Sequence, residues 1–299
     1  MSFEWKGVFP ALLTPFTEKD ELDLPLFEKN LQAQLDAGVH GVIIGGSLGE
    51  ASTITIDEKE ALVKSAVKYL KGKIPVIMNI AETTTKDAVL QAAYAKAWGA
   101  DGLMVLPPMR YKSDDGETVT YFKTIAASTE LPILIYNNPV DYKIDITLDM
   151  FEQLIQHENI EAVKESTRDV TNVTRFKNRF GDRVKILCGV DTLAMEELCL
   201  GADGWVAGLV DAFPKETVTI FNLVKAGKID EATAIYRWFM PLLELDIHPK
   251  LVQYIKLAAS QTGIGSEYVR APRLILEGEE RKRILKVITD ALNDRPELN

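Results

Sequence analysis

The chain has 299 residues, of which 46% are hydrophobic and 26% are charged, a composition typical of a globular protein with a sizeable core. Its formal net charge is −10 and no dense run of Lys or Arg occurs, so nucleic acids and anionic membranes are poor partners. No apolar stretch reaches the roughly 18 residues of a membrane-spanning helix, and the N-terminus lacks the layout of a signal peptide, so we expect a cytoplasmic protein.

Short apolar runs bounded by Gly or Pro alternate with longer segments of helical periodicity, which is the pattern of repeated βα units. The runs are continuously apolar and therefore predict a parallel sheet buried on both faces. Eight of them predict a (β/α)8 barrel. Strands are expected at residues 7–12, 41–45, 75–79, 102–106, 132–136, 160–164, 184–188 and 204–207, and helices at 24–37, 57–70, 85–98, 117–128, 147–157, 170–180 and 192–200.

A doubly wound sheet is the competing architecture, but no Gly-rich dinucleotide motif follows the first run. From about Pro214 onward only helical patterns remain, without a low-complexity linker. We therefore predict a barrel over residues 1–213 and a helical extension over 214–299 that packs on it. Cys188 and Cys199 are expected to stay reduced, and with three scattered histidines they offer no metal-binding spacing.

Active sites of such barrels form at the carboxyl ends of the strands, which gives priority to Lys164 at the end of the sixth run. In a cavity with apolar walls, desolvation would lower the pKa of its ammonium and free the amine to attack a carbonyl. The alternative is a solvated lysine paired with Glu165. Asp191, after the seventh run, could face the same site, although a helix N-cap is its expected role.

Two more features accompany this lysine at strand ends. Tyr136 closes the neighbouring fifth run, and its phenol could move protons, or it could be a core tyrosine with a satisfied hydroxyl. The Gly-rich turn at 45–50 could hold a carboxylate on its backbone N–H groups, or it could be an ordinary βα loop. Together the three features predict a site with an anion cradle, an amine and a phenol.

The chain resembles the dihydrodipicolinate synthase and N-acetylneuraminate lyase superfamily of class I, Schiff-base lyases over nearly its whole length. The matching motifs are the Gly-Ser/Thr-x-Gly-Glu turn at 46–50, the Tyr-Asn-x-Pro segment at 136–139, and Lys164. The resemblance implies an imine on Lys164, Tyr136 as proton shuttle and Ser47 as a relay to Tyr136. It also implies no metal or organic cofactor, and a homotetramer built as a dimer of dimers. The substrate-binding positions that it implies are Gly46, Ser47, Leu48, Asn138 and Ala207.

Departures from the pattern argue against dihydrodipicolinate synthesis. The synthase has two adjacent hydroxyl residues in the turn, whereas Leu48 takes the second place here. The synthase also has an Arg after Tyr-Asn-x-Pro that holds a second carboxylate, which Asp141 of this chain would repel. A Tyr that the synthase borrows from a neighbouring subunit falls on Met109. Arg110 and Tyr111 follow it and could serve the substrate or a subunit contact.

The expected activity is therefore a lyase reaction on a small 2-oxo acid or cyclic imine acid through Lys164. The leading interpretation is dehydration and deamination of pyrroline-4-hydroxy-2-carboxylate, because the loops at 107–112 and 136–139 are most similar to members of that kind. A 2-oxo-3-deoxy sugar-acid aldolase or dehydratase is the first alternative, and a 4-hydroxy-tetrahydrodipicolinate synthase is the second. A non-catalytic ligand-binding barrel is the alternative from another class, but loss of the lysine or the tyrosine would have signalled it.

Overall fold

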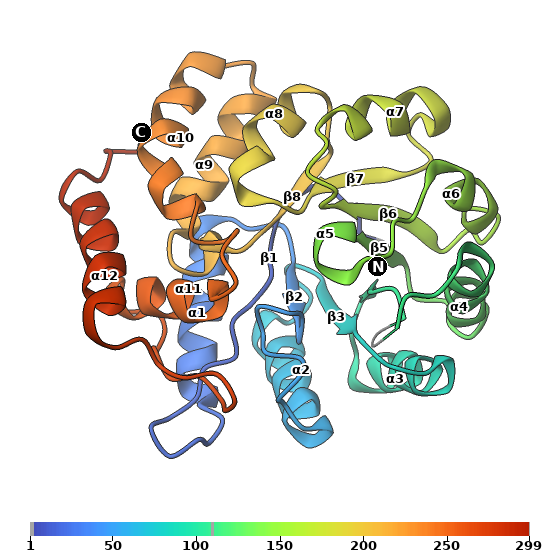
Figure 1. Ribbon diagram of the computed structural model, residues 1–299, viewed down its shortest axis with the longest axis horizontal. Coiled ribbons are helices and arrows are strands. Elements are labelled where there is room, and N and C mark those ends of the chain that lie inside the picture. The colour runs from blue at the N-terminus through green and yellow to red at the C-terminus, as the bar shows by residue number, and fades with distance from the viewer. Residues whose placement is uncertain (1–2, 109–110, 299) are drawn as a thin grey trace.

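The computed structural model describes residues 3–108 and 111–298. Eight parallel strands lie in the order β1-β8-β7-β6-β5-β4-β3-β2, and a bridge between Ala11 and Ile43 joins the first two strands of the chain, so the sheet closes into a ring (Figure 1). The predicted (β/α)8 barrel is confirmed. The strands are β1 (Gly7–Pro10), β2 (Val42–Ile44), β3 (Val76–Ile80), β4 (Gly102–Val105), β5 (Ile133–Asn137), β6 (Ile160–Glu165), β7 (Lys185–Cys188) and β8 (Gly204–Ala207).

Helices surround this ring, and several begin at the side-chain caps that their sequences favour. The Thr55 hydroxyl accepts the N–H of Glu58 while the Glu58 carboxylate accepts the N–H of Thr55, which satisfies two backbone donors at one helix start. The helices between the strands are α1 (Leu24–Ala37), α2 (Ile56–Leu70), α3 (Thr85–Trp98), α4 (Asp115–Ala127), α5 (Pro139–Tyr142), α6 (Leu148–Leu154), α7 (Thr171–Phe180), η1 (Asp191–Leu193) and α8 (Ala194–Cys199).

The short helix α5 was not among the predicted elements. Pro139 occupies its first position, where the missing N–H costs nothing, and the side chain of Asn138 accepts the N–H of Asp141 at 3.1 Å. Lys143 ends it in the left-handed conformation. Residues 139–142 therefore form one rigid turn at the carboxyl end of β5.

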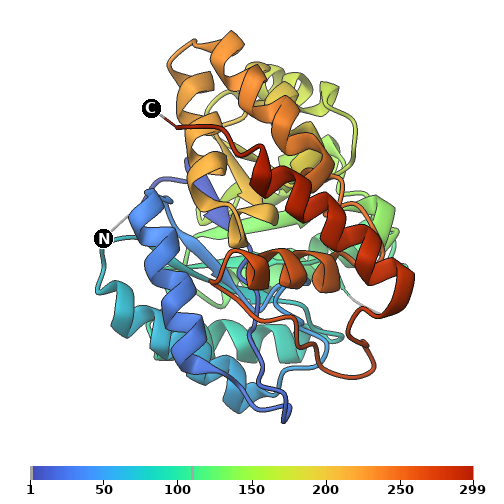
Figure 2. The same cartoon turned by 90° about the vertical axis from the view of Figure 1, so that its left-hand side faces the viewer.

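The last helices gather on one side of the barrel (Figures 1 and 2). The helix α9 (Pro214–Lys225) packs against β1, β8 and α1, in the place of the eighth helix of a barrel. The division of the chain after residue 213 into a barrel and an extension therefore stays a prediction. No helix within the described ranges is long and apolar enough to cross a membrane. Cys188 is buried, Cys199 is exposed, and both are free thiols. The helical elements after β8 are η2 (Leu209–Asp211), α9 (Pro214–Lys225), α10 (Ile229–Leu243), α11 (Leu251–Gln261) and α12 (Gly278–Asn293).

A buried ion pair joins this extension to the turn after β2. Lys256 of α11 donates to the carboxylate of Glu50, and the two side chains are 1% and 0% exposed. The N–H of Arg270 donates to the same carboxylate at 3.1 Å, while Lys256 also donates to the carbonyl of Tyr268. Burial lowers the pKa of Lys256 to about 8, and Glu50 opposes that shift. The pair therefore fixes the Gly-rich turn relative to the C-terminal helices.

Lys256→Met should reduce the free energy of unfolding by about 3 kcal/mol, because it leaves the Glu50 carboxylate buried without its main counter-charge. Urea denaturation measures this change. Glu50→Gln combined with Lys256→Met should cost less than the sum of the single variants, because the double variant removes both charges of the buried pair together. Lys286→Met, which removes an exposed pair with Asp290, should leave the urea midpoint unchanged. Equal effects of the two lysine variants would contradict this account.

Candidate active site

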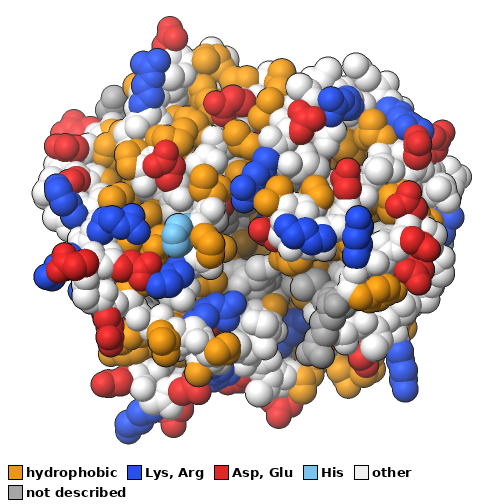
Figure 3. All heavy atoms as spheres, in the orientation of Figure 1, with side chains coloured by type: hydrophobic (Ala, Val, Ile, Leu, Met, Phe, Trp, Pro, Cys, Tyr) orange, Lys and Arg blue, Asp and Glu red, His pale blue; other side chains and the backbone are white. Residues whose placement is uncertain are grey.

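A pocket opens at the carboxyl ends of the strands, near the middle of the face seen in Figure 3. Its volume is about 90 Å³, which suits a small molecule. Its walls come from the strand ends, the turn after β2, the α5 segment and the connection between α10 and α11. Its lining includes Ala11, Gly46, Ser47, Leu48, Met104, Tyr136, Asn138, Asp141, Tyr142, Lys164, Ser166, Arg168, Gly189, Val190, Val206, Ala207, Gly208, Asp246, Ile247 and Leu251.

Lys164 and Tyr136 lie side by side at the base of this pocket. They are register partners on β6 and β5, and the Lys164 Nζ atom lies 4.0 Å from the centre of the Tyr136 ring. Both residues are only 7% exposed. A Cβ atom at Gly189 would lie 2.7 Å from Lys164 Cε and 2.1 Å from the hydroxyl oxygen of Ser166. Only glycine at the end of β7 therefore leaves room for the lysine side chain.

The surroundings of these two groups change their acidity. Burial lowers the pKa of Lys164, and the carboxylate of Asp246 is the strongest influence in the opposite direction. Burial raises the pKa of Tyr136 to about 12, while an N–H donated by the side chain of Asn138 to the phenol oxygen at 3.1 Å opposes that rise. At neutral pH the site thus holds a neutral phenol beside an amine that loses its proton more readily than a solvated lysine.

The hydroxyl of Ser47 meets a partner that the sequence analysis did not propose. Its oxygen lies 2.5 Å from the hydroxyl oxygen of Tyr142, which α5 presents from the same chain. The resemblance implied a relay from Ser47 to Tyr136, whereas the ring of Tyr136 packs edge-on against Tyr142 with centroids 5.6 Å apart. The Asn138-Pro139 start of α5 was the one sequence signal that could have placed Tyr142 here.

Three carboxylates lie in or near the pocket. The Asp141 carboxylate accepts a hydrogen bond from Asn138 Nδ2 at 2.7 Å, and Asp246 comes from the C-terminal extension. The expected N-cap role of Asp191 is wrong, because its buried carboxylate accepts the N–H groups of Gly208 and Leu209 beyond β8. Asp191 therefore links the segment after β7 to the segment after β8.

The predicted site residues fall into three groups. The pocket brings together Lys164, Tyr136, Ser47, Gly46, Leu48, Asn138, Ala207 and Asp141. Tyr111 is 55% exposed and borders a different surface hollow, and Arg110 lies outside the described residues, as does Met109. The pocket also includes four residues that were not predicted from the sequence, Tyr142, Ser166, Arg168 and Asp246. Within residues 3–108 and 111–298, no group of three or more His, Cys, Asp or Glu residues could hold a metal ion.

The lowered pKa of Lys164 predicts the pH dependence of covalent capture. Only the neutral amine attacks a carbonyl, so the rate of adduct formation with pyruvate should rise with pH and reach half of its plateau below pH 10.5, the ordinary lysine pKa. Borohydride reduction at a series of pH values, followed by mass spectrometry, measures that rate. A half-maximal rate at or above pH 10.5 would show that this amine is solvated.

Comparison with known proteins agrees with this fold. A model described as the dihydrodipicolinate synthetase family matches residues 4–291. A protein from Exiguobacterium sibiricum named 4-hydroxy-tetrahydrodipicolinate synthase is 32% identical over 275 residues, which are 91% of this chain and 92% of that protein. One of the same name from Kosmotoga olearia is 31% identical, with 97% and 98% coverage. The solved dihydrodipicolinate synthase of Aquifex aeolicus superposes with a TM-score of 0.92 at 28% identity, covering 99% of this chain and 100% of that one.

Proposed function

Because the chain belongs to the dihydrodipicolinate synthetase family of class I lyases, we propose that Lys164 is the residue that forms an imine with a small 2-oxo acid or cyclic imine acid. The observation that carries this proposal is the buried Lys164 amine, which lies 4.0 Å from the centre of the Tyr136 ring at the base of a small pocket. Such an amine can attack C2 of the substrate, and loss of water then gives an imine that withdraws electrons from the carbon chain.

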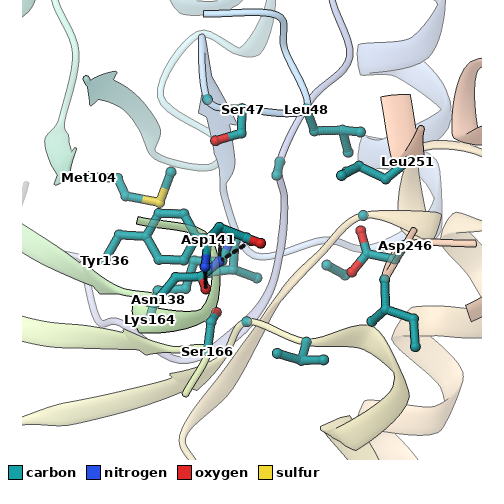
Figure 4. A pocket seen from close by; sticks show the side chains of 18 of the residues that line it. Ser47, Leu48, Met104, Tyr136, Asn138, Asp141, Lys164, Ser166, Asp246 and Leu251 are labelled. Carbon is teal, nitrogen blue, oxygen red and sulfur yellow. Dashed lines mark hydrogen bonds between the residues drawn. The ribbon is translucent and has the colours of Figure 1, made fainter. Parts of the chain in front are cut away.

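The turn after β2 supplies a place for the acid group of the substrate. Gly46, Ser47 and Leu48 line the pocket, and Figure 4 shows Ser47 and Leu48 across the cavity from Lys164 and Tyr136. The backbone N–H groups of Ser47 and Leu48 donate to no acceptor in the described part of the chain. Free N–H groups at a pocket wall favour a carboxylate, so the acid would lie at the turn with the C2 atom directed towards Lys164.

Proton transfer falls to the hydroxyl groups beside the amine. The Tyr136 phenol is neutral at the pH of the cell and can pass a proton to and from the carbinolamine oxygen as water leaves. Tyr142 contacts the Ser47 hydroxyl from the same subunit. It can therefore take the part in the proton relay that a tyrosine from a neighbouring subunit has in the synthase. This chain would therefore not need a tyrosine at Met109.

The substrate we favour is pyrroline-4-hydroxy-2-carboxylate, which would undergo dehydration and deamination. Its single carboxylate suits one turn of free N–H groups, and its cyclic imine can exchange with the Lys164 amine. The α5 segment carries Asp141 and no arginine, so a second substrate carboxylate would find no clamp there. The homotetramer that the resemblance implies stays a prediction.

The names of the relatives favour a second candidate, the condensation catalysed by 4-hydroxy-tetrahydrodipicolinate synthase. A turnover screen separates the candidates. It compares pyrroline-4-hydroxy-2-carboxylate, 2-oxo-3-deoxy sugar acids, sialic acid, and pyruvate with aspartate semialdehyde. Turnover of the last pair alone would overturn the interpretation of Leu48 and Asp141.

Borohydride reduction in the presence of pyruvate should attach one adduct to the wild-type chain, at Lys164. Lys164→Ala should abolish it, whereas Lys185→Ala, which removes a lysine at the opposite end of the neighbouring strand β7, should not. Tyr136→Phe should slow turnover roughly 10²- to 10⁴-fold, the range of a lost acid–base group. An adduct that persists in Lys164→Ala would refute the assignment.

Tyr142→Phe tests whether the intramolecular relay operates. It removes the hydroxyl that lies 2.5 Å from the Ser47 oxygen and keeps the ring that packs on Tyr136. We expect kcat to fall by about 10²-fold with little change in KM, because the lost group moves protons and does not bind the acid. Steady-state kinetics measures both. An unchanged kcat would mean that Ser47 and Tyr136 work without Tyr142.

A further inference from the structure

The pocket wall that faces Lys164 comes from the C-terminal extension. Asp246 lies in the turn between α10 and α11, where its N–H donates to the carbonyl of Leu243 at 3.0 Å. Figure 4 shows Lys164 and Tyr136 on one side of the cavity, Asp246 and Leu251 on the other, and Ser47 on a third. A substrate joined to the Lys164 nitrogen, with its acid group at Ser47, would extend its remaining carbon atoms past Asp246.

The position of this carboxylate depends on a glycine. A Cβ atom at Gly208, just after β8, would lie 2.5 Å from Oδ1 of Asp246. The N–H of the same glycine donates to Asp191, which fixes the backbone against which Asp246 lies. The Asp246 side chain is thus packed against the end of the barrel, with apolar neighbours Ile247 and Leu251 in the pocket wall.

The burial of Asp246 and the carboxylates around it favour its protonated form. Burial raises its pKa to about 8, the negative charge of Asp191 adds to the rise, and Lys164 opposes it. A carboxyl group that keeps its proton near neutral pH can act as a general acid. The negative charges of Asp141 and Asp191 also make this wall unsuitable for an anionic substrate group.

We propose that Asp246 is the acid that protonates a hydroxyl group as it leaves the carbon chain of the imine-bound substrate. The proposal rests on the proposed imine at Lys164 and assigns the dehydration step of that reaction. Loss of a proton from C3 to solvent first converts the imine to an enamine. The enamine nitrogen then re-forms the C2=N bond, the C2–C3 π electrons form a C3=C4 bond, and the C4–O bond breaks. The oxygen keeps that electron pair, takes the proton of Asp246 and leaves as water, and the carboxylate regains a proton from solvent.

The experiment compares wild type, Asp246→Asn and the control Glu244→Gln. Glu244 is an exposed carboxylate in the same turn and does not line the pocket. Three readouts separate the steps. Borohydride trapping with pyruvate reports the imine, and deuterium exchange at the pyruvate methyl group reports the enamine. Elimination from pyrroline-4-hydroxy-2-carboxylate and from its 4-fluoro analogue reports loss of the leaving group, since fluoride departs with far less need of a proton.

We expect Asp246→Asn to keep the pyruvate adduct and the deuterium exchange, to lose about 10²-fold or more in elimination of the hydroxyl, and to eliminate fluoride near the wild-type rate. Glu244→Gln should match wild type throughout. Equal losses with the hydroxyl and fluoro compounds would overturn proton donation, and so would undiminished hydroxyl elimination. A wild-type adduct without elimination from either compound would refute the dehydration role but not the imine. If wild type formed no pyruvate adduct, the proposed function itself would fail.

Discussion

Keeping the Lys164 amine out of water is the constraint on which the proposed chemistry depends. A lysine at a strand end is ordinarily charged and solvated, and its ammonium does not attack a carbonyl. Here the neighbouring strand covers it with the ring of Tyr136, while Gly189 provides the space for its side chain. The cost of desolvating the charge lowers the pKa of the amine and so favours its reactive form.

The C-terminal helices form one wall of the same pocket. The buried pair of Lys256 and Glu50 ties them to the Gly-rich turn, and Asp246 and Leu251 come from the segment that leads into α11. Glu50 of the turn therefore has a structural role, since its carboxylate contacts the C-terminal extension and does not line the pocket. In this way the anion cradle and the C-terminal segment that carries the carboxylate of the far wall are held together by one set of contacts.

The fold and the base of the site could be predicted because their signals are local. Continuous apolar runs indicate buried parallel strands, and residues that end such strands meet at one end of a barrel. That reasoning placed Lys164, Tyr136 and the turn at Ser47 together, as the pocket has them. It did not place Tyr142, because α5 is a single turn and too short to show periodicity. Asp191 was misassigned, because its partners Gly208 and Leu209 follow a different strand.

The sequence by itself determined the barrel, the family resemblance and the amine with its neighbouring phenol, because apolar periodicity and strand-end position are properties of short segments. Only the tertiary structure decided that the Ser47 hydroxyl meets Tyr142 and that Asp246 faces Lys164. These contacts join residues 95 positions apart in the first case, and parts of the barrel and its extension in the second. Their distances and desolvation arise only once the strands close and the last helices pack.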